Sequence, residues 1–470
     1  MAAIFIGQSK LTTILTTLVG GLVIASASHA NAQCDPQPLG NTLLSDNPSL
    51  NDCFGCVFGV DFSGNTAVVG ATLDSTTALE AGAAYVFDRS GTNWNQTIKL
   101  LPDDGMALDH FGWSTVISSS RLAVGAVAGS GPAGQNTGTV YTYRRLFAWG
   151  LQEKLQPDDA QPFDNFGFSL DLSLTTLAVG APGADIHGAN SGAVYIYQLL
   201  NFAWVLEAKL VPMDGQAGDE FGATVELSNG RIVIGARSDD DNGMNSGSAY
   251  VYERLPGGDW IQRSKLLAED GAENDGFGSS VSIWEDTVAV GALGDDISGS
   301  AYVFTSNDNG LNWSQNAKLV PDNGEQSDRF GAVSTNGDTV IVGADSVSTD
   351  QGFNSGSAYV FTRAGNGWVQ RAQIVPNNPS GDLRNFGFHT VLDGNNNAII
   401  GSFQAAYVYD LDCLPCPADL SGDGVLNFFD VSAFLTFFQI NNPIADMNDD
   451  GVFNFFDVSA YLSAFSAGCP

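Results

Sequence analysis

Short apolar runs that end in Gly-Ala or Gly-Ser recur seven times along the chain, and each is followed by an alternating run centred on Tyr. A Phe-Gly pair precedes each apolar run, and successive pairs are 53–57 residues apart. The Phe residues of these pairs are Phe54, Phe111, Phe166, Phe221, Phe277, Phe330 and Phe386. In the first five units a Trp then stands five residues before a Lys-Leu pair. Such segments, separated by Gly, Asn, Asp and Ser, predict four short antiparallel strands in each unit.

Repeated units of four strands are typical of a β-propeller, in which every unit forms one blade. We therefore expect an all-β seven-bladed propeller over residues 33–412. The seventh unit lacks its last strand, because no Trp and Lys-Leu follow Tyr409. Residues 42–47 begin twelve residues before Phe54, as Lys318-Leu319 does before Phe330. This N-terminal strand is predicted to complete the last blade and to remove an exposed sheet edge.

The Phe-Gly starts, together with Gly180-Ala181-Pro182, resemble the FG-GAP repeats of the integrin alpha-chain propeller. The resemblance covers roughly residues 38–412 and implies the same fold. Some blades of that family carry an Asp-x-Asp-x-Asp-Gly calcium loop between the first two strands. None of the seven corresponding segments has this spacing, so we do not expect calcium in the blades.

Several polar residues recur at fixed places in the units. An Asp two residues before Phe-Gly fits a turn, and the six examples are Asp52, Asp109, Asp164, Asp219, Asp275 and Asp328. The loops after Gly-Ala are acidic and variable, which leaves a solvated rim and a ligand or cation site as alternatives; they carry Asp185, Asp239, Asp240, Asp241, Asp295, Asp296 and Asp345. Residues 306–313 resemble the Asp-box of sialidase-type propellers, which implies a structural hairpin turn.

The charge composition excludes some classes of partner. The chain has 52 Asp and Glu against 18 Lys and Arg, a formal charge of −34. This argues against a nucleic-acid-binding protein and against a polybasic membrane-surface protein, since both need a cationic face. The five Lys after residue 32 all occupy the same blade position and are interpreted as architectural: Lys99, Lys154, Lys209, Lys265 and Lys318.

The N-terminus predicts export. Residues 1–32 hold one charge, Lys10, then an apolar stretch and the small-residue cleavage site Ala30-Asn31-Ala32. This pattern is typical of a signal peptide, with an uncleaved anchor as the alternative. We expect a secreted, extracellular protein that can be attached to the cell surface, and no other apolar run approaches spanning length.

Six cysteines lie at the two ends of the exported chain: Cys34, Cys53, Cys56, Cys413, Cys416 and Cys469. An even number in an exported protein favours disulfides. The preferred hypothesis pairs Cys416 with Cys469, and Cys34 or another N-terminal Cys with Cys413. A zinc site built from the two C-x-x-C pairs is the alternative.

Catalysis has little support in the sequence. After residue 32 the histidines are His110, His187 and His389, in three different units, and no nucleophile–base pair or phosphate loop is visible. Acidic pairs are abundant, which leaves a two-carboxylate glycosidase open, but nothing singles out one pair. We therefore expect a protein that is not an enzyme.

Residues 413–470 contain two similar twelve-residue segments, 419–430 and 446–457, at an offset of 27. Both fit a calcium loop, with oxygen ligands at positions 1, 3, 5, 7, 9 and 12 and Gly at position 6. The first set is Asp419, Ser421, Asp423, the carbonyl of Val425, Asn427 and Asp430. The second set is Asp446, Asn448, Asp450, the carbonyl of Val452, Asn454 and Asp457. Two Ca²⁺ ions are predicted; metal-free Asx turns are the alternative.

Each loop runs into a predicted amphipathic helix, and this duplication resembles the type I dockerin domain and a Cys-terminated variant found in secreted bacterial proteins. The resemblance implies a cohesin-like or cell-surface protein partner. Loop positions 10 and 11, which often read the cohesin, are Phe428-Phe429 and Phe455-Phe456. These pairs fit either an apolar partner contact or the core of a small domain.

Together these features predict a non-catalytic recognition or adhesion protein, attached to a scaffold or cell surface through a calcium-dependent dockerin-like module. The propeller is expected to bind a glycan or protein ligand. The alternative is a secreted carbohydrate-active protein, a lectin or a polysaccharide-degrading enzyme. Calcium is the only cofactor that the sequence predicts.

Overall fold

The computed structural model describes residues 36–45, 52–129, 134–365, 367–376, 384–411, 418, 420, 426–440, 442, 445–447 and 452–467. They form two compact units, a large one within residues 35–413 and a small one within residues 414–470. Among the described residues, no helix is long and apolar enough to cross a membrane.

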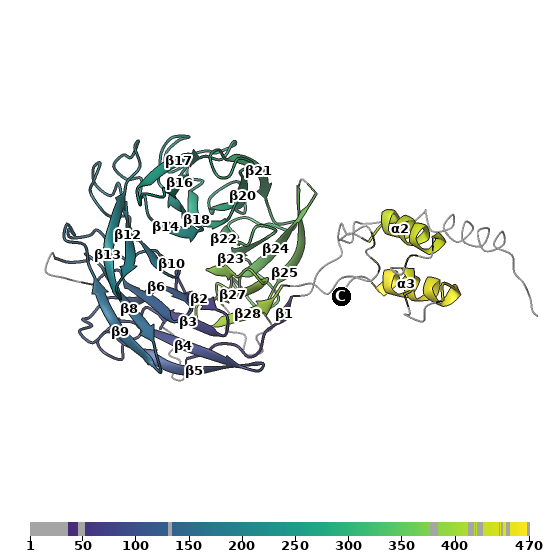
Figure 1. Cartoon of the computed structure of the whole chain (residues 1–470), viewed down its shortest axis with the longest axis horizontal. Helices are drawn as coiled ribbons and strands as arrows, with labels where there is room; N and C mark the ends of the chain where they lie inside the picture. Colours follow the sequence, from purple (N-terminus) through teal and green to yellow (C-terminus); the bar gives the residue numbers. More distant parts are fainter. Residues whose placement is uncertain are drawn as a thin grey trace, which may run out of the picture. The chain divides into compact units, whose positions relative to one another are not determined.

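The large unit is a seven-bladed β-propeller, with seven four-stranded antiparallel sheets around a common centre (Figure 1). Blade 1 is β2 (Val60–Ser63), β3 (Thr66–Ala71), β4 (Ala83–Ser90) and β5 (Asn93–Leu100). Blade 2 is β6 (Phe111–Ser118), β7 (Arg121–Ala126), β8 (Thr139–Arg145) and β9 (Trp149–Leu155). Blade 3 is β10 (Leu170–Leu172), β11 (Thr176–Ala181), β12 (Ala193–Leu200) and β13 (Ala203–Leu210).

The next three blades have the same order. Blade 4 is β14 (Thr224–Ser228), β15 (Arg231–Ala236), β16 (Ser248–Arg254) and β17 (Trp260–Leu266). Blade 5 is β18 (Phe277–Trp284), β19 (Thr287–Ala292), β20 (Ser300–Thr305) and β21 (Ser314–Leu319). Blade 6 is β22 (Phe330–Thr335), β23 (Thr339–Ala344), β24 (Ser357–Ala364) and β25 (Gly367–Ile374). The prediction of seven four-stranded blades is confirmed.

Blade 7 takes strands from both ends of the propeller. It consists of β26 (Thr390–Leu392), β27 (Asn397–Gly401), β28 (Ala406–Asp410) and the N-terminal β1 (Gln37–Pro38). β1 lies upstream of the segment 42–47 that the sequence assigned to this place. Within 42–45, Leu43 makes a single bridge, to Ala406. Only two residues of β1 pair with β28, although the N–H groups of Leu39 and Leu43 also donate to the carbonyl groups of Val408 and Ala406.

The repeated aromatic residues form the packing between strands. In all seven blades the Phe of Phe-Gly meets the first Tyr of the alternating run edge-on, with ring centroids 5.1–5.5 Å apart. Such pairs contribute about 0.5–1.5 kcal/mol beyond their buried area. The Val and Ile residues of the second strands are buried between neighbouring blades.

In six of the seven blades a glycine directly precedes the third strand and allows neighbouring blades to join. Gly192 has φ +85°, and a Cβ there would lie 2.0 Å from the carbonyl oxygen of Phe221 in the next blade. The two residues form a parallel bridge between the blades. Only glycine permits this approach, because it has no Cβ and tolerates a positive φ.

The small unit contains α2 (Phe428–Gln439) and α3 (Phe455–Ala467). Phe434 of α2 and Tyr461 of α3 are buried and stacked, with ring centroids 4.1 Å apart. The pairs Phe428-Phe429 and Phe455-Phe456 are 67–68% exposed. They therefore do not belong to the core of this unit, and the second of the two alternatives for them is wrong.

Candidate functional site

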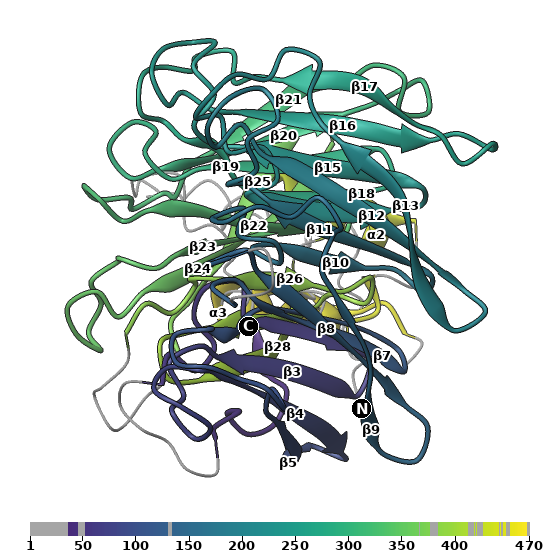
Figure 2. The ribbon, with the colours of Figure 1, turned by 90° about the vertical axis from the view of Figure 1, so that its left-hand side faces the viewer.

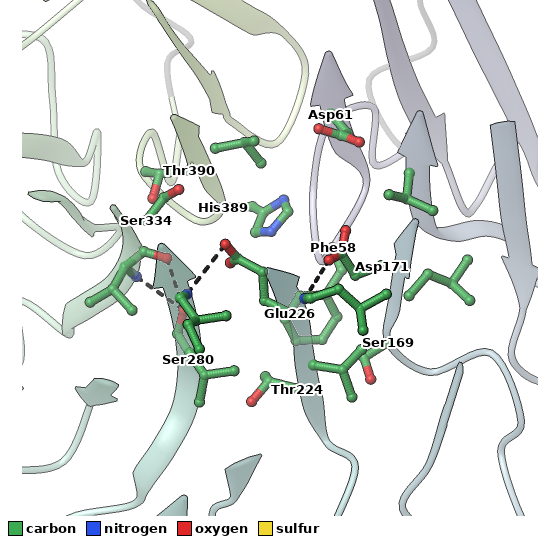
Figure 3. A pocket seen from close by; sticks show the side chains of 18 of the residues that line it. Phe58, Asp61, Ser169, Asp171, Thr224, Glu226, Ser280, Ser334, His389 and Thr390 are labelled. Carbon is green, nitrogen blue, oxygen red and sulfur yellow. Dashed lines mark hydrogen bonds between the residues drawn. The ribbon is translucent and has the colours of Figure 1, made fainter. Parts of the chain in front are cut away.

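A central cavity of about 430 Å³ lies where the first strands of the blades converge. Figure 3 shows its lining, with side chains supplied by several blades around one hollow. Seven similar blades would give a symmetric lining, but this one is not symmetric. Acidic side chains come from blades 1, 3 and 4, and a histidine comes from blade 7.

The acids are Asp61, Asp171 and Glu226, and each lies on a first strand between two apolar residues. Because side chains alternate across a strand, the flanking residues pack toward the blade while the carboxyl group faces the cavity. The corresponding residues of the other blades are Val116, Ser282, Ser334 and Val391. Our sequence reasoning missed these acids, although an acid inside an apolar strand was a usable signal.

Each carboxyl group accepts a hydrogen bond from the next blade. The backbone N–H of Ile117 donates to Asp61 over 2.6 Å, and that of Leu227 donates to Asp171 over 2.6 Å. Glu226 Oε1 accepts from the Ser282 hydroxyl over 3.0 Å and from the Ile283 N–H over 3.3 Å. The carboxyl groups thus connect adjacent blades.

Two serines perform the same task in the later blades. The hydroxyls of Ser282 and Ser334 accept from the backbone N–H groups of Thr335 and Leu392, both over 2.9 Å. A serine therefore suffices for the contact between blades, and the contact alone does not require a carboxyl group.

Burial changes the ionisation of these acids. It raises the pKa of Asp61 to about 8 and that of Asp171 to about 6. Burial, followed by repulsion from the Asp171 carboxylate, raises the pKa of Glu226 well above its usual value. The cavity thus holds two carboxyl groups, those of Asp61 and Glu226, that keep their protons near neutral pH and can donate hydrogen bonds.

His389 adds an acceptor to the same cavity. Burial lowers its pKa to about 4, and one hydrogen bond joins it to the backbone of Val60. Its Nδ1 is buried and has no hydrogen-bond partner among the described residues. Its ring lies 5.7 Å from that of Phe58. The lining therefore offers protonated carboxyls, hydroxyls, a neutral imidazole and an aromatic face, the combination that binds a polar, uncharged ligand.

The lysines that recur at the same position of five blades form ion pairs. Lys265 reaches Asp214, Asp239 and Asp241 at 2.6–2.9 Å and lies over the ring of Tyr250. Burial alone lowers the pKa of Lys265, but its bonds to the three carboxylates outweigh burial and raise it. The other pairs are Lys99–Asp74, Lys154–Asp104, Lys209–Asp159 and Lys318 with Asp270, Asp295 and Asp296. The architectural interpretation of the lysines agrees with these contacts.

These contacts also occupy the acidic loops that were a candidate ligand or cation site. Asp239, Asp241, Asp295 and Asp296 pair with lysines. Asp185 and Asp240 accept from the backbone N–H groups of Asn190 and Asn245, and Asp345 faces Arg329 at 3.5 Å.

The Asp residues before Phe-Gly close turns, as predicted. Each of five accepts from the backbone N–H three residues earlier, over 2.5–2.8 Å: Asp109, Asp164, Asp219, Asp275 and Asp328. In the turn 306–313, Asp308 accepts from Asn312 and the Ser306 hydroxyl accepts from the Gly310 N–H. His110 lies 3.7 Å from Glu80, and the backbone N–H of His187 donates to Ser191.

Half of the predicted calcium ligands lie outside the described residues: Asp419, Ser421, Asp423, Val425, Asn448 and Asp450. Asn427 caps α2, and Asp430 accepts from the Asn427 N–H over 2.8 Å. Asp457 likewise accepts from the Asn454 N–H over 2.8 Å. Among the described residues, no group of three or more His, Cys, Asp or Glu is placed to hold a metal ion. Of the other predicted ligands in the second loop, Asp446 and Val452 are among the described residues.

The final acids of the two loops fit a cation nevertheless. Asp430 and Asp457 are completely buried in a unit whose described residues include no Lys or Arg. Oδ1 of Asp457 is buried without a hydrogen-bond partner in the described part of the chain. A buried carboxylate oxygen is unfavourable unless it is paired or binds a metal.

Cys53 and Cys56 form a disulfide. This bond removes one C-x-x-C pair from the zinc alternative, which is therefore wrong in its four-cysteine form. It also leaves Cys34 as the N-terminal cysteine for a bond to Cys413. Cys34, Cys413, Cys416 and Cys469 lie outside the described residues.

Comparison with known proteins identifies the repeat. A model of the FG-GAP repeat matches six segments that together exceed half of the chain: 41–87, 94–143, 149–197, 204–252, 260–304 and 313–361. No curated protein matches. A chain of the structure titled "Crystal Structure of Mitotic Checkpoint Complex" is similar, with 11% identity, 82% of this chain and 95% of that chain covered, and a TM-score of 0.48. With six matched repeats in a ring of seven blades, the chain belongs to the FG-GAP repeat family.

Proposed function

We propose that this chain is an exported, non-catalytic recognition or adhesion protein, in which the propeller binds a glycan or a protein. A calcium-dependent dockerin-like module attaches it to a scaffold or to the cell surface. The observation that carries the recognition role is the asymmetric central cavity. Repetition explains the blade framework, but it does not explain why three blades place acids in this hollow and one places there a histidine whose Nδ1 has no partner among the described residues.

The chemistry of the cavity favours a polar ligand such as a sugar. Hydroxyl groups can accept from protonated Asp61 and Glu226 and donate to Nδ1 of His389, while Phe58 offers an apolar ring face. The volume of about 430 Å³ is within the range of small-ligand sites.

The attachment role rests on the small unit. Its two loops end in the buried acids Asp430 and Asp457, and the bare Oδ1 of Asp457 supports a metal there. A bound Ca²⁺ ion would be coordinated by the loop oxygens and would neutralise part of their negative charge. The exposed Phe428-Phe429 and Phe455-Phe456 pairs support an apolar contact with a cohesin-like or cell-surface protein.

A glycan array tests the recognition role. The full chain should bind a defined group of glycans, and Glu226→Gln or His389→Ala should weaken this binding at least tenfold. Glu269→Gln, in an exposed loop, is the matched control and should bind as the wild type does. Equal binding by all four proteins would place the ligand elsewhere, and no binding to any glycan or surface protein would contradict the role.

The three buried carboxyls also favour the alternative, a carbohydrate-active enzyme, more than the sequence did. Neighbouring acids with raised pKa values are typical of catalytic sites. Against this, Asp61 and Asp171 each bind two backbone N–H groups. A hydrolysis screen separates the two functions, because turnover that Asp171→Asn abolishes would establish the enzyme.

A further inference from the structure

The turns of blades 2 and 3 carry more exposed large apolar side chains than the corresponding turns of the other blades, among which blade 5 has Leu311 (50%) and Trp284 (38%). Five large side chains are exposed in the turns of blades 2 and 3: Leu146 (69%), Phe147 (104%), Leu174 (64%), Leu200 (55%) and Phe202 (66%). The matching third-to-fourth strand turns of blades 1, 4 and 6 are built mainly of Gly and polar residues, at 90–93, 255–259 and 364–367. We call the five side chains the apolar tips. Repetition of the blade does not require them, so they call for a separate explanation.

The apolar tips lie at one end of adjacent blades. In blade 2, Arg121 pairs with Arg144, and Arg145 pairs with Trp149, which brings both hairpin turns to the same end of the sheet. Blade 3 has the same register, with Leu200 opposite Ala203. The guanidinium of Arg144 lies 4.8 Å from the ring centre of Phe202, so the end of β8 contacts the β12–β13 turn of the next blade. Figure 2 shows the β8–β9 and β12–β13 turns on the same side of the ring.

Two arginines stand directly behind the apolar tips. Neither Arg121 nor Arg144 forms an ion pair within the described residues, although the protein has 52 acidic residues. Nε of Arg121 is buried without a hydrogen-bond partner in the part of the chain that the structure describes. The four turns of blades 2 and 3 contain no Asp or Glu. The acidic loops after Gly-Ala leave the opposite ends of the strands, where Ala126 pairs with Thr139.

This arrangement excludes some occupants. A symmetric dimer through the apolar tips would place Arg121 and Arg144 of both copies in one interface, and the like charges would repel. The net charge of −34 does not prevent an anionic partner, because charges are screened over about 8 Å in physiological salt. The nearby charges then act on a partner: the two arginines, against the Glu153 carboxylate that accepts from the Trp204 N–H.

We propose that the apolar tips insert into an anionic lipid surface. Protruding Phe and Leu side chains enter the boundary between headgroups and acyl chains, as amphipathic anchors do. Arg121 and Arg144 lie at the ends of the strands that lead into these turns. When the tips are inserted, the two guanidinium groups would be at the level of the lipid phosphates and could donate hydrogen bonds to them. Tips that project from turns fit a deformable layer, whereas a protein partner would need a matching hollow for each of them.

Vesicle flotation tests the inference with the full chain in calcium. The wild type should float with vesicles of phosphatidylcholine and phosphatidylglycerol, and much less with phosphatidylcholine alone. Phe147→Asp combined with Phe202→Asp should weaken binding by roughly tenfold or more, because both apolar insertions are lost. Arg121→Gln with Arg144→Gln should remove the preference for the anionic lipid.

The matched control is Pro256→Asp, in the exposed turn at the corresponding place of blade 4, and it should float as the wild type does. Thermal melting of every variant checks that the propeller is folded, which is expected because Phe147 and Phe202 are exposed. A wild type that stays unbound to both vesicles, or a double Phe variant that floats unchanged, would overturn the proposal. Equal loss in Pro256→Asp would do so as well, since binding would then not depend on the apolar tips.

Discussion

At the scale of single residues, the central cavity combines a structural role with the recognition role that we propose. Asp61, Asp171 and Glu226 connect their blades to the next ones, yet Ser282 and Ser334 make the same connection without a charge. The contact between blades therefore does not explain the carboxyl groups, whose ionised form is disfavoured by burial. The raised pKa values measure how unfavourable the buried environment is for the ionised form.

This predicts a pH dependence of stability. The pKa of Asp61 is about 8 in the folded chain and near its ordinary value when unfolded, so the folded chain holds the extra proton between these values. Its stabilising contribution is complete below the unfolded pKa and is lost as pH rises toward 8. Each pKa unit of difference corresponds to about 1.4 kcal/mol. Thermal melting of wild type and Asp61→Asn from acid to pH 8 should show a shallower decline in the variant, and parallel curves would refute this.

At the scale of elements, contacts between blades depend on positions where substitution is costly. Gly192 is the clearest case, since its Cβ would collide with the backbone of the next blade. Lys265 is a second case, because it draws together three carboxylates from two loops.

Gly192→Ala should lower the free energy of unfolding by about 3 kcal/mol or more, through strain and the collision with Phe221. Gly218→Ala is the control: φ there is +96°, but nothing lies within 4 Å of the added Cβ. It should cost only about 1–2 kcal/mol. Denaturant unfolding compares the two, and equal losses would show that the contact between blades contributes little.

Lys265→Met should destabilise the propeller by about 2 kcal/mol, because three carboxylates would then face each other without a cation. Lys209→Met, which breaks a pair with Asp159 alone, should have a smaller effect. The difference should shrink at high salt, since screening weakens the repulsion. A salt-independent difference would assign the loss to packing instead.

The blades could be predicted from the sequence because every repeat contains the same pattern of strand residues. The Phe, Tyr and Gly positions are local signals, and all of them occupy the predicted places. The central acids were missed because their partners, such as Ile117 for Asp61, belong to another repeat. The position of β1 was displaced for a similar reason, since Tyr409 and Asp410 select their partners across the whole propeller.

At the scale of the whole molecule, two compact units divide the work that we propose. The propeller has its core between blades, whereas the described residues of the small unit form a core of five buried side chains, Phe434 and Tyr461 among them, with ten partly buried ones around it. A core this small is typical of domains that need a metal to fold.

Removal of calcium should therefore affect the small unit alone. In chelator, circular dichroism of the full chain should lose the helical signal of α2 and α3, while the main melting transition of the propeller stays in place. Added calcium should restore the helix, and Asp457→Asn should weaken this response at least tenfold. Asp449→Asn, in the same loop but outside the predicted ligand set, should respond normally. A helical signal that ignores calcium in all proteins would refute the metal site.

The closing strand links the order of synthesis to the order of folding. Pro38 pairs with Tyr409, so a residue that is synthesised before all seven repeats cannot form its strand pair until the last repeat has been synthesised. Contacts over such sequence distances form slowly. Until blade 7 arrives, the growing chain is an open arc with two unpaired edges, and a chain shortened before β28 keeps them. The earliest strand of the propeller is thus the final one to be placed.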